Sequence, residues 1–177
     1  MDQPPTFDTE TYRLLDDGTI PNNERLPLVV YRGAFELRAV EPETTIVERL
    51  EKNNWGGAWI DGIYPFHHYH ARSHEVLVIA AGSVDVQMGG PRGPILTLTA
   101  GDAMVVPAGV GHCRVAARGN LSVVGAYPPG QRDWDLKRAT AADRAVALAE
   151  LAVVKLPSHD PIVGAHGPLL RLWKRLK

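Results

Sequence analysis

The middle of the chain, from Trp55 to Tyr127, alternates short apolar runs with turn residues, and this pattern most restricts the fold. The runs are AWIDGI, FHHYH, EVLVIAAG, VDVQM, ILTLTAG, AMVVP, HCRVAA and LSVVGAY. Gly, Pro or polar residues interrupt them at intervals typical of short strands, and no helical period runs through the region. Many short strands in succession predict an all-β sandwich or barrel.

The segments before this region follow other patterns. Residues 1–25 are polar and rich in Asp, Asn and Pro, which predicts an irregular N-terminal arm with turns. The run LPLVVYR at 26–32 is apolar and β-branched, which predicts a strand. Residues 43–54, ETTIVERLEKNN, place three apolar side chains on one face, which predicts a short helix.

After the β-like region the pattern becomes helical. Thr140 and Asp143 flank the start of an Ala-rich run in the manner of a capping box, with Asp in place of Glu. We expect this helix to run to Val154, with Pro157 preventing its continuation. A loop, SHDPIVGAHG, which we expect to be structured, then leads to a short basic amphipathic end, PLLRLWKRLK.

These patterns predict one domain of three parts. They are an N-terminal arm at 1–25, a β-barrel at 26–128 and a helical extension at 129–177. A chain of 177 residues is long enough to bury one sizeable core, and its 45% hydrophobic and 22% charged residues are typical of a soluble globular protein.

Composition also restricts the partners and the compartment. The net charge is −1, with no footprint of clustered Lys and Arg for nucleic acid. The single cysteine, Cys113, excludes an internal disulfide and fits a reducing compartment. The polar N-terminus is no signal peptide, and no apolar stretch reaches the roughly 18 residues that span a membrane. We expect a cytoplasmic protein without a nucleic-acid or membrane partner.

Four of the seven histidines lie at positions 67, 68, 70 and 74, directly before Glu75 and an apolar run. Residues i and i+2 of a strand share a face, so His68 and His70 project side by side and can bind one ion. Glu75 adds a carboxylate if its strand is an antiparallel neighbour. Two His and one carboxylate are typical of open transition-metal sites. Taken alone, histidines near a strand are more often surface or satisfied core residues than metal ligands.

The spacing of two motifs favours metal ligands over surface or satisfied core residues. G-x5-H-x-H-x4-E-x6-G runs from Gly62 to Gly82, and G-x5-P-x-G-x2-H runs from Gly101 to His112. Both resemble the motifs of the cupin superfamily, with one departure, Ala116, where the second motif often has Asn. The resemblance implies a jelly-roll barrel, or double-stranded β-helix, around one divalent transition metal (Fe, Mn, Ni, Zn or Co). By the resemblance, the metal ligands are His68, His70, Glu75 and His112.

Histidines outside this set have open roles. His74 occupies a spacing at which the acid sometimes falls, but the count to Gly82 favours Glu75. His67 should face away from His68, at the surface or in a hydrogen bond to a ligand. For His159 and His166 an exposed loop position is favoured over the barrel mouth. Candidate polar residues inside the barrel are Gln87, Arg114 and Tyr127.

The chain as a whole resembles the YjlB-like group of small bacterial cupins. The resemblance rests on GTIPNN with LPLVVYR, on HHYHARSHEVL and on DPIVGAHGPLLRLW. Cupins resemble one another in forming dimers, and an exposed edge strand invites pairing. We therefore expect a homodimer in which the 26–32 strand adds to a neighbour's sheet.

Several functions fit such a chain. Four ligands leave one or two positions of an octahedral ion open, which favours a metal-dependent enzyme acting on a small molecule. Fe(II) or Mn permits oxygenation, while Zn, Ni or Co permits Lewis-acid isomerisation or hydrolysis; analogy with the cupins favours a dioxygenase-type oxidoreductase. The alternatives are a non-catalytic small-molecule-binding or sensing cupin and a metal-free isomerase, and the intact ligand set argues against the latter.

Overall fold

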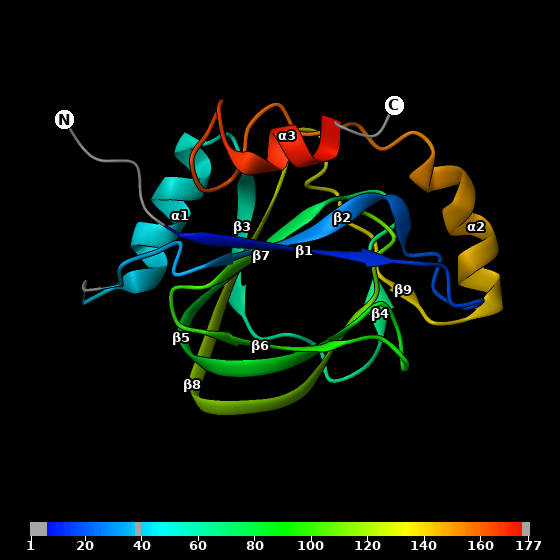
Figure 1. Ribbon diagram of the computed structural model, residues 1–177, viewed down its shortest axis with the longest axis horizontal. Helices are drawn as coiled ribbons and strands as arrows, with labels where there is room; N and C mark the ends of the chain where they lie inside the picture. The colour runs from blue at the N-terminus through cyan, green and yellow to red at the C-terminus, as the bar shows by residue number, and fades with distance from the viewer. Residues whose placement is uncertain (1–6, 38–39, 175–177) are drawn as a thin grey trace.

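The structure, a computed structural model, describes residues 7–37 and 40–174, and most of its elements are strands (Figure 1). The strands are β1 (Asp8–Leu14), β2 (Asn23–Arg32), β3 (Gly56–Asp61), β4 (His68–Tyr69), β5 (Glu75–Met88), β6 (Ile95–Thr99), β7 (Ala103–Val106), β8 (His112–Tyr127) and β9 (Lys137–Arg138). The helices are α1 (Pro42–Lys52), α2 (Ala141–Leu151) and α3 (Pro168–Lys174). The all-β jelly-roll prediction is confirmed, and so are the predicted helices near residues 43–54 and 141–154.

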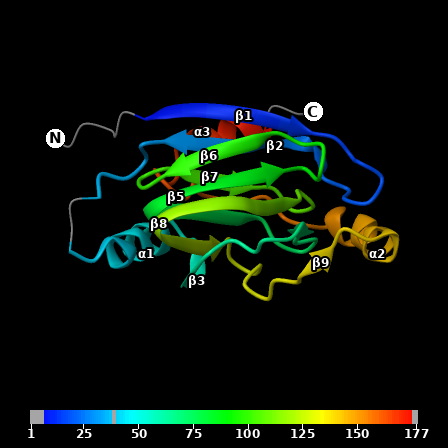
Figure 2. The same cartoon turned by 90° about the horizontal axis from the view of Figure 1, so that it is seen from below.

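The strands form one curled sheet in the order β1-β2-β7-β5-β8-β4-β9, with β3 paired to β8 and β6 paired to β5. Figure 2 shows β1, β2, β7, β5 and β8 lying beside one another across the molecule, in the order in which they pair. The two longest strands, β5 and β8, pair antiparallel from Val76↔Ala126 to Met88↔His112. On its other edge, the first half of β5 pairs with β7 and the second half with β6, so this strand joins the parts of the barrel.

The β5–β8 ladder bends near Gly82. Its register shifts between Ile79 and Ser83, and Gly82 has a φ of 72°. A Cβ at Gly82 would lie 2.6 Å from the backbone oxygen of Arg118. Only glycine meets both demands without strain, which explains its place in the first motif.

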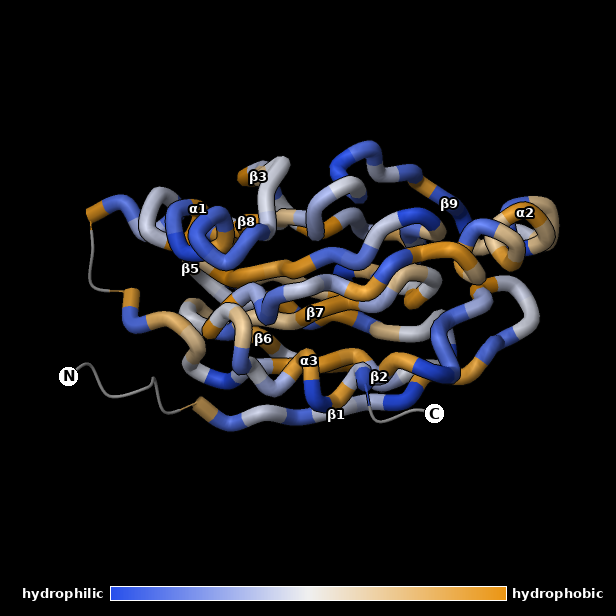
Figure 3. Tube along the Cα trace, turned by 90° about the horizontal axis from the view of Figure 1, so that it is seen from above, coloured by the Kyte–Doolittle hydropathy of each residue, from blue (hydrophilic) through white to orange (hydrophobic). Residues whose placement is uncertain are grey.

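Alternation along the strands divides the core into two layers. Leu77 and Ile79 point into the barrel, where they pack among side chains such as Met104. Val76 and Val78 point outward into a second apolar cluster. Helices α1 and α3 cover this outer layer with the buried residues Ile46, Leu50, Leu169 and Trp173. Figure 3 shows the resulting apolar band along the central strands.

The N-terminal arm differs from its prediction. Residues 8–14 form strand β1, which pairs antiparallel with β2 from Asp8↔Arg32 to Leu14↔Asn23. Its side chains are mostly exposed, so its sequence is polar and lacks a strand pattern. Backbone hydrogen bonds to β2 make it an edge strand. Residues 1–6 of the predicted arm lie outside the described residues.

The predicted position of β2 at a sheet edge is wrong. β2 lies between β1 and β7, so both of its edges are paired. Within the described residues, the free edge on this side of the sheet belongs to β1. The predicted division of the chain at residues 25 and 128 stays a prediction.

The C-terminal extension packs on the sheet through both helices and the short strand β9. The side chain of Thr140 accepts a hydrogen bond from the backbone N–H of Asp143, which confirms the predicted cap of α2. The helix ends earlier than predicted, at Leu151. Among the described residues, no helix is long and apolar enough to cross a membrane.

The loop before α3 is ordered around Asp160, which is fully buried. Its carboxylate accepts hydrogen bonds from the Tyr31 hydroxyl of β2 at 2.8 Å and from the backbone N–H groups of Ile162, Val163 and Leu169. One carboxylate thus accepts hydrogen bonds from the backbone N–H groups of the turn and of the start of α3, and links both to β2 through Tyr31. This confirms the prediction of a structured loop.

We expect Asp160→Ala to lower the free energy of unfolding by about 3 kcal/mol or more, because it leaves several buried donors without an acceptor. Tyr31→Phe removes only one of these hydrogen bonds and should cost about 1–2 kcal/mol. Urea denaturation of both variants measures the difference. Equal losses for the two variants would show that Asp160 is not the centre of this network.

Candidate metal centre

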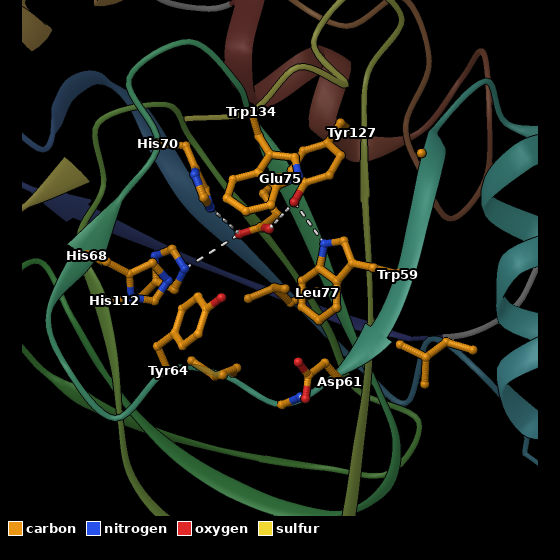
Figure 4. A pocket seen from close by; sticks show the side chains of 14 residues that line it. Trp59, Asp61, Tyr64, His68, His70, Glu75, Leu77, His112, Tyr127 and Trp134 are labelled. Atoms are coloured by element: carbon orange, nitrogen blue, oxygen red, sulfur yellow. Dashed lines mark hydrogen bonds and ion pairs between the residues drawn. The ribbon is translucent and has the colours of Figure 1, made fainter. Parts of the chain in front are cut away.

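Three histidines from two distant parts of the chain meet inside the barrel. His68 of β4 pairs with His112 of β8, and His70 follows β4 directly. One ring nitrogen of each lies within 4.8 Å of the others, and all three side chains are buried. Glu75 at the start of β5 completes the group, with its Oε2 atom 3.6 Å from His70 Nε2 and 3.5 Å from His112 Nε2 (Figure 4).

The second nitrogen of each imidazole faces a backbone carbonyl. His68 Nδ1 lies 3.0 Å from the oxygen of Phe66, and His112 Nδ1 lies 3.3 Å from that of Val110. His70 Nδ1 makes a short contact with the oxygen of Asp135. A carbonyl only accepts, so each Nδ1 carries the proton and each Nε2 keeps its lone pair. This is the tautomer in which metal-binding histidines are held by neighbouring carbonyls.

Glu75 is held on one side only. Its Oε1 accepts a hydrogen bond of 3.0 Å from the Tyr127 hydroxyl, which in turn accepts one of 2.8 Å from Trp59 Nε1 (Figure 4). Its Oε2 is buried and has no hydrogen-bond partner. The distances to the two histidine nitrogens are too long for hydrogen bonds. Three lone pairs and one unsatisfied carboxylate oxygen therefore surround the same small space.

The charges of these groups are coupled. Burial lowers the pKa of His68 to about 3, helped by His112 beside it. Burial alone would lower the pKa of His70, but the Glu75 carboxylate raises it. Burial alone would raise the pKa of Glu75, but His70 and His112 hold it well below its usual range. Burial and Glu75 raise the pKa of Tyr127, so its hydroxyl stays a donor.

This donor set fits a divalent transition metal. Neutral imidazole nitrogens and one carboxylate oxygen, all facing inward, are the ligands that such ions take in proteins. Without an ion, the buried Oε2 atom of Glu75 has no hydrogen-bond partner, which is costly in a protein interior. The His-His-His cluster and its carboxylate neighbour thus match the chemistry of the predicted site.

Glu75, the first residue of β5, and His74, the residue directly before it, face opposite sides of the sheet. Glu75 shares the inward face with Leu77, whereas His74 shares the outward face with Val76. His74 Nδ1 accepts a 2.9 Å hydrogen bond from the N–H of Ala108, and its ring packs 4.7 Å from that of Trp173. His74 is therefore a buried residue of the outer layer, with a pKa lowered to about 3 by burial.

Of the other candidate residues considered from sequence, only Tyr127 lines the cavity beside the histidines. Tyr127 lines the cavity, as predicted, whereas Gln87 instead donates to the carbonyl of Pro91 in a hairpin. Arg114 and His67 do not line the cavity either. His159 and His166 also lie away from it, which agrees with the favoured loop position.

A cavity of about 280 Å³ opens beside the ligands. Its aromatic walls are Trp59, Tyr64, Tyr127 and Trp134, and its charged lining residues are Asp61 and Glu75. Trp134 packs edge-on to His70 with ring centroids 5.5 Å apart, and Tyr64 packs in the same way on His68 at 5.2 Å. Sequence reasoning proposed Tyr127 but missed Trp59, Tyr64 and Trp134, because no motif marks their positions.

A cupin-domain family model matches residues 61–124, the stretch that contains both motifs. The chain is thus a cupin by sequence as well as by architecture. It is 38% identical over 167 residues to the uncharacterized protein YjlB of Bacillus subtilis (strain 168), which covers 94% of this chain and 97% of that protein. The chain belongs to the YjlB-like group of small bacterial cupins.

Solved structures are more distantly similar. Acireductone dioxygenase from Bacillus anthracis, with a cadmium ion in its active centre, aligns at a TM-score of 0.36 and 14% identity over 50% of this chain and 60% of that chain. KdgF from Halomonas sp. aligns at a TM-score of 0.34 and 18% identity over 75% of this chain and 89% of that chain. Alignments with these scores add no functional information.

The hydrogen bonds predict opposite tautomers for neighbouring histidines. In the metal-free protein at alkaline pH, we expect His68, His70 and His112 to carry the proton on Nδ1. His74 should carry it on Nε2, because its Nδ1 accepts from Ala108. Long-range ¹H–¹⁵N correlation spectra of the imidazoles distinguish the two forms. An Nε2–H form at two or more of the three site histidines would contradict the arrangement.

Proposed function

We propose that the chain is a metal-dependent cupin that acts on a small molecule, with one divalent transition metal held by His68, His70, Glu75 and His112. The observation that carries the proposal is the convergence of three histidine nitrogens within 4.8 Å of one another, two of them 3.5 and 3.6 Å from the Glu75 Oε2 atom, which has no hydrogen-bond partner. No protein group among the described residues satisfies that oxygen. The donor set does not choose among Fe, Mn, Ni, Zn and Co.

When bound, such an ion supplies Lewis acidity or, with Fe or Mn, redox chemistry toward a ligand in an open coordination position. The protein's own groups would orient and shield that ligand. Tyr127 fixes the Glu75 carboxylate, and Trp59 fixes the Tyr127 hydroxyl in turn. This chain of hydrogen bonds keeps one carboxylate oxygen aimed at the histidines while the other is occupied.

The cavity supports a small ligand with an apolar side. Its volume of about 280 Å³ is at the lower end of small-molecule sites. Trp59, Leu77 and Trp134 provide apolar walls, and Trp134 remains 43% exposed. A ligand would therefore pack between aromatic walls on one side and meet the metal ligands on the other.

Oxygenation by a dioxygenase-type oxidoreductase is the favoured chemistry, by analogy with the cupins. A Lewis-acid isomerase and a non-catalytic binding or sensing protein are the alternatives. Only the favoured chemistry consumes dioxygen in the presence of a substrate. Cys113, half-buried and unpaired, fits action in the reducing cytoplasm.

Metal content tests the ligand set. We expect His70→Ala and His112→Ala to lose most bound metal, since each removes one ligand, and Glu75→Gln to weaken binding by removing the charge. His74→Ala is the matched control, because it removes a buried imidazole next to Glu75 that faces the other way; it should change metal affinity by less than about tenfold. Elemental analysis and zinc titration measure both. Loss of binding in His74→Ala but not in Glu75→Gln would reverse the assignment.

We also propose a homodimer, formed through the free edge of β1 rather than through β2. An exposed edge strand offers unpaired backbone groups to a second chain. Light scattering at micromolar concentration should give twice the mass of the 19.3 kDa chain. A monomer mass over the same range would remove this part of the proposal.

A further inference from the structure

We propose that residues 134–138, which lie outside both motifs, complete the metal centre, and that Asp135 is the residue that positions His70. The inference rests on the proposed metal site and concerns how that site is assembled. Its consequence is that metal binding and docking of this segment strengthen each other.

Asp135 contacts the His70 region twice. Its backbone oxygen faces Nδ1 of His70, which turns Nε2 toward Glu75. Its side-chain Oδ1 accepts hydrogen bonds from the backbone N–H groups of Ala71 at 2.9 Å and Arg72 at 3.1 Å. The same residue therefore fixes both the ring of His70 and the turn that follows it.

The residues around Asp135 support the same ligand segment. Trp134 packs its ring against His70. Strand β9 pairs with β4 at His68↔Arg138 and Tyr69↔Lys137, so β4 is held between β8 and β9. Without β9, the two-residue strand that carries His68 would be paired on one side only.

Lys137 links residues 134–138 to helix α2. The Lys137 ammonium lies 3.7 Å from the Asp135 carboxylate and 3.3 Å from that of Glu150 in α2. The side chains of all three residues are largely shielded from solvent, so these ion pairs are screened less than surface pairs. The position of Asp135 thus depends on the docking of α2 as well as on the loop.

The other two histidines do not need this segment for their ring orientation. His68 and His112 face the carbonyls of Phe66 and Val110, each two residues earlier in the chain. Their tautomers follow from the local conformation. The ring of His70 alone depends on a carbonyl 65 residues away.

Because the bound ion would require His70 in this orientation, binding and docking are linked. If the docked segment raises metal affinity by some factor, bound metal must favour docking by the same factor. Exposed Arg132, three residues before Asp135, offers a trypsin site that reports on docking.

The test compares zinc affinity and His70 tautomer in three variants. Asp135→Ala should lower zinc affinity by about 10- to 100-fold, the range for partners that orient a ligand. Asp135→Asn should restore most of it, because its amide oxygen still accepts from Ala71 and Arg72. Asp133→Ala is the matched control, since the Asp133 side chain is 95% exposed and its only ion pair within the described residues, at 3.8 Å to Arg72, is solvent-exposed and therefore weak. In the metal-free Asp135→Ala protein, His70 should lose its single Nδ1–H form while His68 and His112 keep theirs.

Zinc should also slow tryptic cleavage after Arg132 in the unaltered protein, which needs no variant to fold. Unchanged zinc affinity and an unchanged His70 tautomer in Asp135→Ala would overturn the positioning role. Cleavage that ignores zinc would overturn the linkage. If the unaltered protein binds no zinc or other divalent transition metal, the proposed function fails, while the His70 tautomer in the metal-free variants still decides the role of Asp135.

Discussion

The candidate metal centre depends on the closure of the β5–β8 ladder on itself. Glu75 begins β5, whereas His112 lies opposite Met88 at the other end of the same ladder. In a flat sheet, thirteen steps of about 3.3 Å would separate them by roughly 40 Å. Their side chains are instead 3.5 Å apart. The bend at Gly82 and the register shifts around it bring the two ends together, so the barrel must curl before a site can exist.

Alternation along β5 then assigns each side chain its chemistry. Inward positions carry Glu75 and the apolar floor of the barrel, while outward positions carry His74 and the surface that the helices cover. A shift of one residue would exchange the carboxylate for an imidazole already bound to Ala108. The outer helices therefore protect the site indirectly, because they fix the register of the strand that presents its acid.

The sequence predicts those features of the fold and of the candidate site that have a fixed period or spacing. The two motifs identified the residues that converge, and the turn residues predicted a barrel. β1 was missed because its side chains are mostly exposed, so its pattern is that of a loop, and hydrogen bonds to β2 define it. The roles of Asp135 and Asp160 were missed for a related reason: most of their hydrogen bonds are to backbone groups, which any sequence possesses. A residue that donates only its backbone N–H can have any side chain, so such contacts leave no sequence pattern.

The orientation of the three histidine rings comes from two sources, and the proposed metal affinity depends on both. The carbonyls that face His68 and His112 come with the local strand and turn conformation, so a sequence that folds into the barrel obtains two of three ring orientations from the motifs themselves. The third comes from a segment whose position depends on Lys137, Glu150 and the docking of α2. If the proposed site binds metal, two chains with identical motifs could hold the same ligands in the same barrel and still differ in metal affinity. The difference would lie in residues 134–138, where the ring of His70 is held or released.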